Sequence, residues 1–482
     1  DSAAAEKGGA MRHVITITII FLAGLLGTYL IMALAMGISV CTGLSLSSIS
    51  SNTRLGAGGP YAIVSKALGF EAGGSIGIPL YLSRPLGVAM YVFGFREGWL
   101  WIFPDHPALV VDLAVFVALF GLALASANLA FRVQFVIMAV IAASIVSIVA
   151  SPITLTPRAD IVWLGSYRGF PEGGFAGVTF WMVFAVFFPA TTGILAGANM
   201  SGEVRDPRRS ISRGTLWAIA VSSVVYFALA WWLARAGTTE ELTSNYTLLI
   251  DRALWPPLVL AGLLGATFSS ALASAVGGPR ILMAMSQNGL LPRSEWLART
   301  TARGEPRNAV LLTAVLSLAC LMVRDLNAIA PLVTMFFLIT YMVINLVLLL
   351  ESSLGLTSFR PALVVPRIIP LLGVLGCVFS MFIVSPTFGL VAVVMVMVTY
   401  ISIQRRGIES TGQDVRSGLF GSIAEWAAAK VSAQGVENKR AWKPNLLVPF
   451  EDPSQVRGEF AFLHEVCQPE GSIKPVSYTH LT

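Results

Sequence analysis

The stretch FFPATTGILAGANM, residues 187–200, decides how the sequence is interpreted, because it places helix-breaking residues inside an apolar segment. Pro189 lacks a backbone donor and clashes with the preceding helical turn, while Gly193 and Gly197 add backbone freedom. A helix broken here has unpaired carbonyls on one side and unpaired N–H groups on the other, and the two threonine hydroxyls after Pro189 can satisfy freed groups. Transporters use such mid-membrane breaks as ion sites. The alternative is a proline kink that only shapes helix packing.

The composition around this stretch is that of a membrane protein. The 482 residues are 55% hydrophobic and 12% charged, with a mean hydropathy of +0.76, whereas soluble chains carry about 25% charged residues. Apolar segments of roughly 20 residues, the length that crosses a bilayer, recur from Val14 to Tyr400. They are too long and continuous for barrel strands. We therefore expect an all-α polytopic membrane protein.

The apolar segments divide the chain into three parts: an N-terminal tail (1–13), a transmembrane transporter domain (14–404) and a cytoplasmic C-terminal segment (405–482). Arginine and lysine are concentrated in one set of alternate loops, which places that set and the C-terminus in the cytoplasm. The eleven predicted spans are 14–41, 74–95, 107–127, 131–150, 176–200, 214–235, 253–285, 308–323, 328–351, 364–384 and 386–404.

The C-terminal segment is polar and mixed in composition. Its short apolar run NLLVPF, residues 445–450, predicts one strand at the start of a cytoplasmic α/β domain. The final residues, 477–482, resemble nothing before them. We therefore expect this segment to be truncated and the natural chain to be longer.

A second candidate site lies in the stretch GATFSSALASAVGGP, residues 265–279. The adjacent hydroxyls of Ser269 and Ser270, with the Ala266 carbonyl one turn earlier, suit a hard cation. The alternative is that the small residues only permit close helix packing.

Arg84 is the one charged residue that the sequence places near the middle of the membrane, and such residues are usually functional. Tyr91 follows seven residues later, on nearly the same helix face. We interpret Arg84 as a candidate residue of the ion pathway. The alternative is a structural tie to neighbouring carbonyls.

Other function classes find little support in the sequence. The net charge of +6 comes from basic residues in loops between spans, which excludes nucleic acid as a partner. Asp, Glu and His do not occur at the depth of Arg84, which argues against a proton relay. Neither a nucleophile–base pair nor a metal cluster occurs in the loops, so we expect no enzyme activity and no cofactor.

Several long stretches resemble one family. They are TGLSLSSISSNTRLGAGGPY (42–61), VAMYVFGF (88–95), FFPATTGILAGANMSGEVRDP (187–207), SSALASAVGGPRIL (269–282), LNAIAPLVTMFFLITYMVINL (326–346) and AWKPNLLVPFEDP (441–453). Through them the chain resembles the cation–chloride cotransporters, in particular bacterial-type Na–K–Cl cotransporter-like proteins of the amino acid–polyamine–organocation superfamily. The resemblance runs from about Gly24 to Lys474.

The resemblance implies an inverted-repeat transporter fold of five plus five helices and two more. It also implies electroneutral cotransport of chloride with potassium, sodium or both. The implied partners are these ions, the lipid bilayer of the plasma or inner membrane, and a second copy of the chain in a homodimer. The implied potassium-binding residues are Tyr91, Pro189 and Thr192, the chloride-binding residues Gly193, Ile194, Leu195 and Tyr341, and the sodium-binding residues Ala266, Ser269 and Ser270.

The sequence departs from the family pattern at its start. Family members have a complete, discontinuous first helix before the segment that begins at Gly24, whereas here only Met11 to Ala23 precedes it. The ligands that this helix contributes are absent from the sequence. We therefore expect the chain as written to lack coupled transport, and a family-type first helix placed before Gly24 to restore it.

Two other functions remain open. An amino acid or polyamine permease of the same superfamily would use the N–H groups of the broken helix for a substrate carboxylate. A non-transporting membrane sensor or regulatory subunit would bind a partner through residues 407–482 without solute flux. The pair Tyr91 and Thr192 suits a dehydrated cation better than an amino acid, which favours the cotransporter.

Overall fold

The computed structural model describes residues 23–406 except 53–55, 155, 158, 168–178, 239–240, 243–244, 246, 302–303, 324–325 and 355–358, and residues 445–450, 459–467 and 472–477. The start of the first predicted span, at 14–22, and residues 478–482 lie outside the described residues. The chain divides into two compact units, Asp1–Arg416 and Ser417–Thr482.

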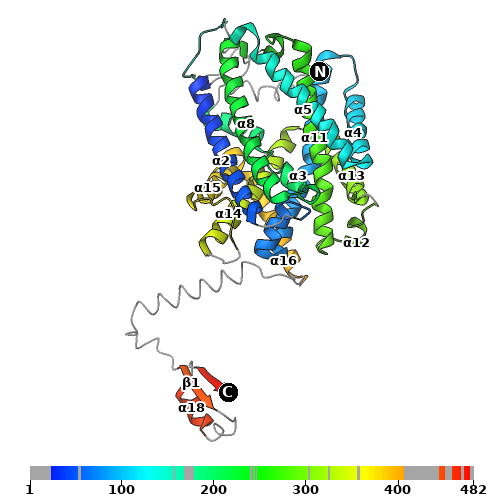
Figure 1. The fold of residues 1–482 in the computed structure, drawn as a ribbon. Coiled ribbons are helices and arrows are strands. Elements are labelled where there is room, and N and C mark those ends of the chain that lie inside the picture. The colour runs from blue at the N-terminus through cyan, green and yellow to red at the C-terminus, as the bar shows by residue number, and fades with distance from the viewer. Residues whose placement is uncertain are drawn as a thin grey trace. The chain divides into compact units, whose positions relative to one another are not determined.

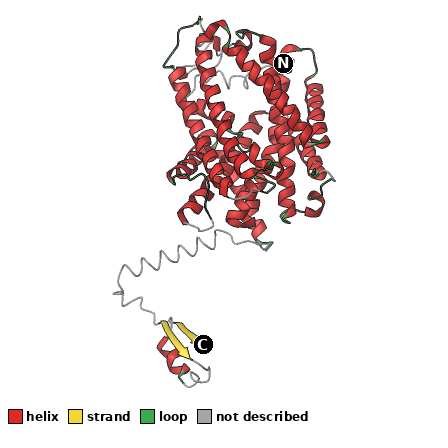
Figure 2. Ribbon diagram, in the orientation of Figure 1, coloured by secondary structure: helices red, strands yellow, loops and turns green. Residues whose placement is uncertain are grey.

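Every regular element described in the first unit is a helix (Figures 1 and 2). The α-helices are α2 (Gly24–Asn52), α3 (Pro60–Ile102), α4 (Ala108–Ala125), α5 (Ala127–Val149), α6 (Phe180–Phe187), α7 (Ala196–Asn199), α8 (Pro207–Ala236), α10 (Leu248–Asp251), α11 (Pro256–Gln287), α12 (Ser294–Leu297), α13 (Arg307–Val323), α14 (Leu326–Leu354), α15 (Ile368–Val384) and α16 (Pro386–Gln404). Three short 3₁₀ helices are η2 (Pro152–Thr154), η4 (Phe188–Thr191) and η5 (Ser201–Glu203).

The helices have the length and composition of membrane spans. Within the described part of the chain, nine helical segments are long and apolar enough to cross a membrane, and α13 and α15 are apolar but shorter. Many large apolar side chains on α4, α5, α8, α15 and α16 are exposed, as on a lipid-facing surface. The predicted class, an all-α polytopic membrane protein, is confirmed.

Helix α3 begins earlier than the predicted span, at Pro60 instead of residue 74. Gly69 interrupts it with a φ of 87°, a conformation that favours glycine, so a short helix precedes the long apolar one. Helix α3 packs against α11, α13, α14 and α16. Because α3 lies among so many helices, its central residues Val88, Ala89 and Val92 are buried.

The second unit holds a small parallel pair of strands. Strand β1 (Asn445–Phe450) occupies the six residues predicted as a strand, and it pairs with β2 (Ser472–Ser477). Helix α18 (Phe460–Cys467) lies between the two strands in sequence, as a crossover connection between parallel strands requires.

Candidate ion site at a broken helix

The segment from α6 to α7 is a helix broken at its middle. Helix α6 ends at Phe187, η4 follows, and the backbone leaves helical geometry at Thr192, with φ −92° and ψ 58°. Helix α7 begins only at Ala196. The predicted break is therefore confirmed, and it lies where Pro189 removes a backbone donor and Gly193 relaxes the backbone.

The two threonines of the break satisfy carbonyls in their own segment. The Thr191 hydroxyl donates to the Phe188 carbonyl at 2.9 Å, and the Thr192 hydroxyl donates to the Pro189 carbonyl at 2.7 Å. Both threonines are buried. These bonds replace helical hydrogen bonds that the break removes, because a carbonyl left unpaired in an apolar interior is costly.

Two neighbouring helices satisfy the next two carbonyls. Tyr226 on α8 donates its hydroxyl to the Ala190 carbonyl at 3.2 Å. Ser39 on α2 donates its hydroxyl to the Thr191 carbonyl at 3.0 Å. Four successive carbonyls, from residue 188 to residue 191, thus each accept a hydroxyl hydrogen bond.

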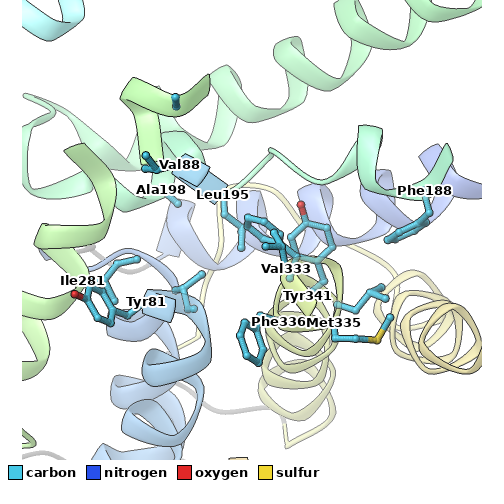
Figure 3. Packing of buried hydrophobic residues seen from close by; sticks show 14 of the residues in the cluster. Tyr81, Val88, Phe188, Leu195, Ala198, Ile281, Val333, Met335, Phe336 and Tyr341 are labelled. Carbon is cyan, nitrogen blue, oxygen red and sulfur yellow. The ribbon is translucent and has the colours of Figure 1, made fainter. Parts of the chain in front are cut away.

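The other side of the break offers donors. The N–H groups of Gly193, Ile194 and Leu195, between η4 and α7, donate to no backbone carbonyl within the described residues. The Tyr341 hydroxyl lies next to the Ile194 backbone and points toward the chain between Phe188 and Leu195 (Figure 3). Tyr341 is 0% exposed, and its hydroxyl has no hydrogen-bond partner in the described structure. The donor side of the break therefore places backbone N–H groups next to a buried hydroxyl.

A buried polar network holds Tyr341 in place. The Asn345 side-chain amide donates to the Tyr341 carbonyl at 2.9 Å and to the Thr42 hydroxyl at 2.8 Å, and it accepts from the Ser45 hydroxyl at 2.7 Å. Thr42 and Ser45 lie three and six residues after Ser39, on one face of α2. This face of α2 therefore fixes both the carbonyl side of the break and Tyr341.

Comparison with known proteins identifies the family. A family model described as amino acid permease matches residues 7–431. The chain belongs to the amino acid permease family. It is similar to solute carrier family 12 member 2 of Mus musculus, with 28% identity over 515 residues that cover 95% of this chain and 42% of that protein. It is also similar to solute carrier family 12 member 9 of Danio rerio, with 29% identity that covers 89% of this chain and 53% of that protein.

A third relative, solute carrier family 12 member 2 of Squalus acanthias, is 31% identical over 77% of this chain and 36% of its own length. These relatives confirm the predicted resemblance to the cation–chloride cotransporters of the amino acid–polyamine–organocation superfamily. The chain spans between about a third and about half of the length of these relatives.

In this member of the amino acid permease family, the break brings together the predicted chloride residues, Gly193, Ile194, Leu195 and Tyr341. Of the predicted potassium residues, Pro189 and Thr192 lie on the carbonyl side. Tyr91 on α3 is close enough to Tyr226 for an electrostatic interaction between them, which places it near the same side. Whether these residues bind ions stays a prediction.

The predicted sodium residues lie on α11. Ala266, Ser269 and Ser270 are half-buried on α11, and the Ser269 carbonyl accepts from the Gln134 side chain of α5 at 3.3 Å. Within the described residues, no hydrogen bond joins them to residues 188–195. Whether they bind sodium stays a prediction.

Arg84 is buried on α3 with 5% exposure. Its Nε and Nη2 atoms make no hydrogen bond within the described structure, and its guanidinium lies 5.1 Å from the centroid of the Phe337 ring. The alternative interpretation, a structural tie to neighbouring carbonyls, is wrong for these two atoms. Phe337 in turn lies 6.3 Å from the Tyr341 ring, so Arg84 is a neighbour of the donor side of the break.

Sequence reasoning missed four residues that shape the site: Ser39, Thr42, Tyr226 and Asn345. The signal that points to them is a polar side chain in an apolar span, since such groups need partners inside the protein. The three-residue spacing of the α2 hydroxyls is visible in the sequence, whereas their partners are far away along the chain.

The contact between Ser39 and Thr191 gives a testable prediction. Replacing Ser39 with Ala should leave the Thr191 carbonyl unpaired and destabilise the break locally by about 1–3 kcal/mol. Hydrogen–deuterium exchange in a peptide covering residues 187–200 should become at least about fivefold faster. The matched control is Ser222→Ala, because that exposed hydroxyl donates only to the Ile219 carbonyl of its own helix. Equal exchange in the two variants would contradict the assigned role of Ser39.

Proposed function

We propose that this chain carries the ion site of a secondary transporter that couples chloride movement to potassium, sodium or both. The observation that carries the proposal is the buried Tyr341 hydroxyl next to the Ile194 backbone, in a segment whose N–H groups at residues 193–195 donate to no backbone carbonyl within the described residues. Buried donors without acceptors are rare in native proteins, so their clustering suggests an absent acceptor. A chloride ion accepts several such bonds at once.

The geometry favours binding by individual donors over binding by a helix dipole. Helix α7 has only four residues, so its dipole is small. Backbone donors held by a buried network need little reorganisation, and hydrogen bonds to a charged acceptor are about twice as strong as neutral ones. Because α2 and Asn345 fix Tyr341, the hydroxyl stays oriented toward the anion.

For the cation, the proposal uses two separate positions. Tyr91, Pro189 and Thr192 offer oxygens for potassium beside the break, as the family resemblance implies. Ser269, Ser270 and the Ala266 carbonyl offer oxygens for sodium on α11. The similarity to solute carrier family 12 supports the cotransporter over the other members of the superfamily.

An amino acid or polyamine permease is the second candidate, because the matching family model carries that description. The same N–H groups would then accept a substrate carboxylate. Competition separates the two candidates: glycine and other amino acids should displace radioactive chloride from the purified chain only if a carboxylate uses the site.

Coupling itself is tested by radioactive chloride uptake into proteoliposomes that contain the chain, with an inward sodium gradient, with an inward potassium gradient and with neither. The expected result is chloride uptake that a cation gradient drives. Chloride uptake that neither cation gradient changes would count against a cotransporter.

The Tyr341 hydroxyl gives a sharper prediction. Tyr341→Phe removes one donor and should weaken chloride binding roughly tenfold, because a hydrogen bond to a charged group contributes roughly 1.5–3 kcal/mol. Radioactive chloride binding to the purified chain measures this change. Tyr400→Phe on α16 is the matched control and should leave the affinity unchanged. An unaltered chloride affinity in the Tyr341 variant would remove this residue from the site.

The adjacent serines of α11, Ser269 and Ser270, give a second prediction, which concerns sodium. Changing Ser269 and Ser270 together to Ala should abolish any sodium dependence of chloride binding or flux and leave folding intact, because alanine suits a helix. The control pair is Ser222 and Ser223 on α8, also adjacent serines, whose hydroxyls both donate to the Ile219 carbonyl. Sodium dependence that survives in the Ser269/Ser270 variant would refute the sodium site.

A further inference from the structure

Arg84 differs from two other arginines of the helices, Arg96 and Arg280. Arg96 on α3 pairs with Asp112 at 3.1 Å, and Arg280 on α11 pairs with Glu305 at 3.1 Å. Arg84 forms no ion pair with any described carboxylate, although it is as buried as Arg280. An uncompensated buried charge is strongly unfavourable, and a guanidinium stays protonated at any ordinary pH. Within the described residues nothing neutralises Arg84, which points to a bound anion as its counter-ion.

The surroundings of Arg84 indicate where such a counter-ion would bind. The Phe337 ring centroid lies 5.1 Å from the guanidinium carbon of Arg84 and 6.3 Å from the Tyr341 ring centroid. Arg84 is also within electrostatic range of both Tyr91 and Tyr341. The Nε and Nη2 atoms of Arg84, which make no hydrogen bond within the described structure, thus share a neighbourhood with Tyr341, whose hydroxyl lies next to the Ile194 backbone. An anion bound there would be neutralised by Arg84.

The positive charge of Arg84 also disfavours the binding of a potassium ion nearby. Tyr91 follows Arg84 by seven residues, a helical rise of about 10 Å. Two unit positive charges about 10 Å apart, at an effective dielectric constant of about 20, weaken each other's binding by about tenfold, so a potassium ion near Tyr91 would bind less tightly in the presence of Arg84.

The hydrogen bonds of the carbonyls at the break also disfavour potassium. The four carbonyls of residues 188–191 already accept hydroxyl protons from threonine, serine and tyrosine side chains. Each such proton places partial positive charge where a cation would otherwise bind. The carbonyl side of the break therefore has little electrostatic need for a potassium ion.

We propose that Arg84 is a tethered cation that takes the electrostatic place of potassium, so that the anion at Tyr341 and Ile194 binds without potassium. This inference rests on the anion site of the proposed function and narrows its coupling cation to sodium. Arg84 then acts as a specificity-determining residue, because it neutralises the anion and repels a mobile cation.

The test measures radioactive chloride binding to the purified full chain at constant ionic strength, in N-methylglucamine, sodium or potassium salts. The unmodified chain should bind chloride equally well in potassium and in N-methylglucamine. Arg84→Gln should bind chloride at least about tenfold more weakly in N-methylglucamine and regain part of the affinity in potassium. Arg84→Lys keeps the charge and should remain independent of potassium. Arg132→Gln, at an exposed position on α5, is the matched control and should behave like the unmodified chain.

Rubidium binding can be measured directly on the unmodified chain, without relying on the folding of any variant. The affinity of the unmodified chain for rubidium should be at least about tenfold lower than that of Arg84→Gln. The inference alone is overturned if potassium raises the chloride affinity of the unmodified chain tenfold, or if Arg84→Gln binds chloride normally in N-methylglucamine. If the unmodified chain binds no chloride in any salt, the proposed function fails as well.

Discussion

The carbonyl groups of a broken helix, buried among apolar helices, are the constraint on which the rest of this site depends. Inside a membrane, water does not compensate a backbone group that has lost its helical partner. Residues 188–191 therefore need donors, and the chain supplies them from three places: the break itself, α2 and α8. These contacts hold the break open, because each hydroxyl that binds a carbonyl removes the tendency of the segment to close into a continuous helix.

Once the carbonyl side is satisfied, the donor side of the break sets the chemistry. Ser39, Thr42 and Ser45 form one polar face of α2, which reaches Thr191 at one end and Asn345 at the other. Asn345 fixes the turn of α14 that carries Tyr341. One helix face thus links the two sides of the break, so that the unpaired N–H groups, the Tyr341 hydroxyl and the Arg84 guanidinium share one neighbourhood.

Much of this arrangement is predictable from the sequence, for physical reasons that differ between residues. Pro189 and Gly193 mark the break locally, because their effect on a helix does not depend on the fold. Apolar length identifies the spans in the same way, although the kink at Gly69 extends α3 beyond its predicted start. The assignment of Tyr341 to the chloride site comes only from the family resemblance. Ser39, Tyr226 and Asn345 could not be paired with their partners, because a hydroxyl in an apolar span shows only that a partner exists. Arg84 packs against Gly278 of α11 and Phe337 of α14 and has no described carboxylate as a partner, and these long-range contacts could not be predicted from the sequence.

The central claim is that the donor side of the break, with Tyr341 and Arg84, binds an anion. X-ray diffraction from crystals of the chain grown in bromide tests this most directly, because bromide replaces chloride and is located by its anomalous scattering. The account predicts an anomalous peak between the Ile194 N–H, the Tyr341 hydroxyl and the Arg84 guanidinium. Bromide peaks only elsewhere on the molecule, with this position empty at saturating bromide, would contradict it.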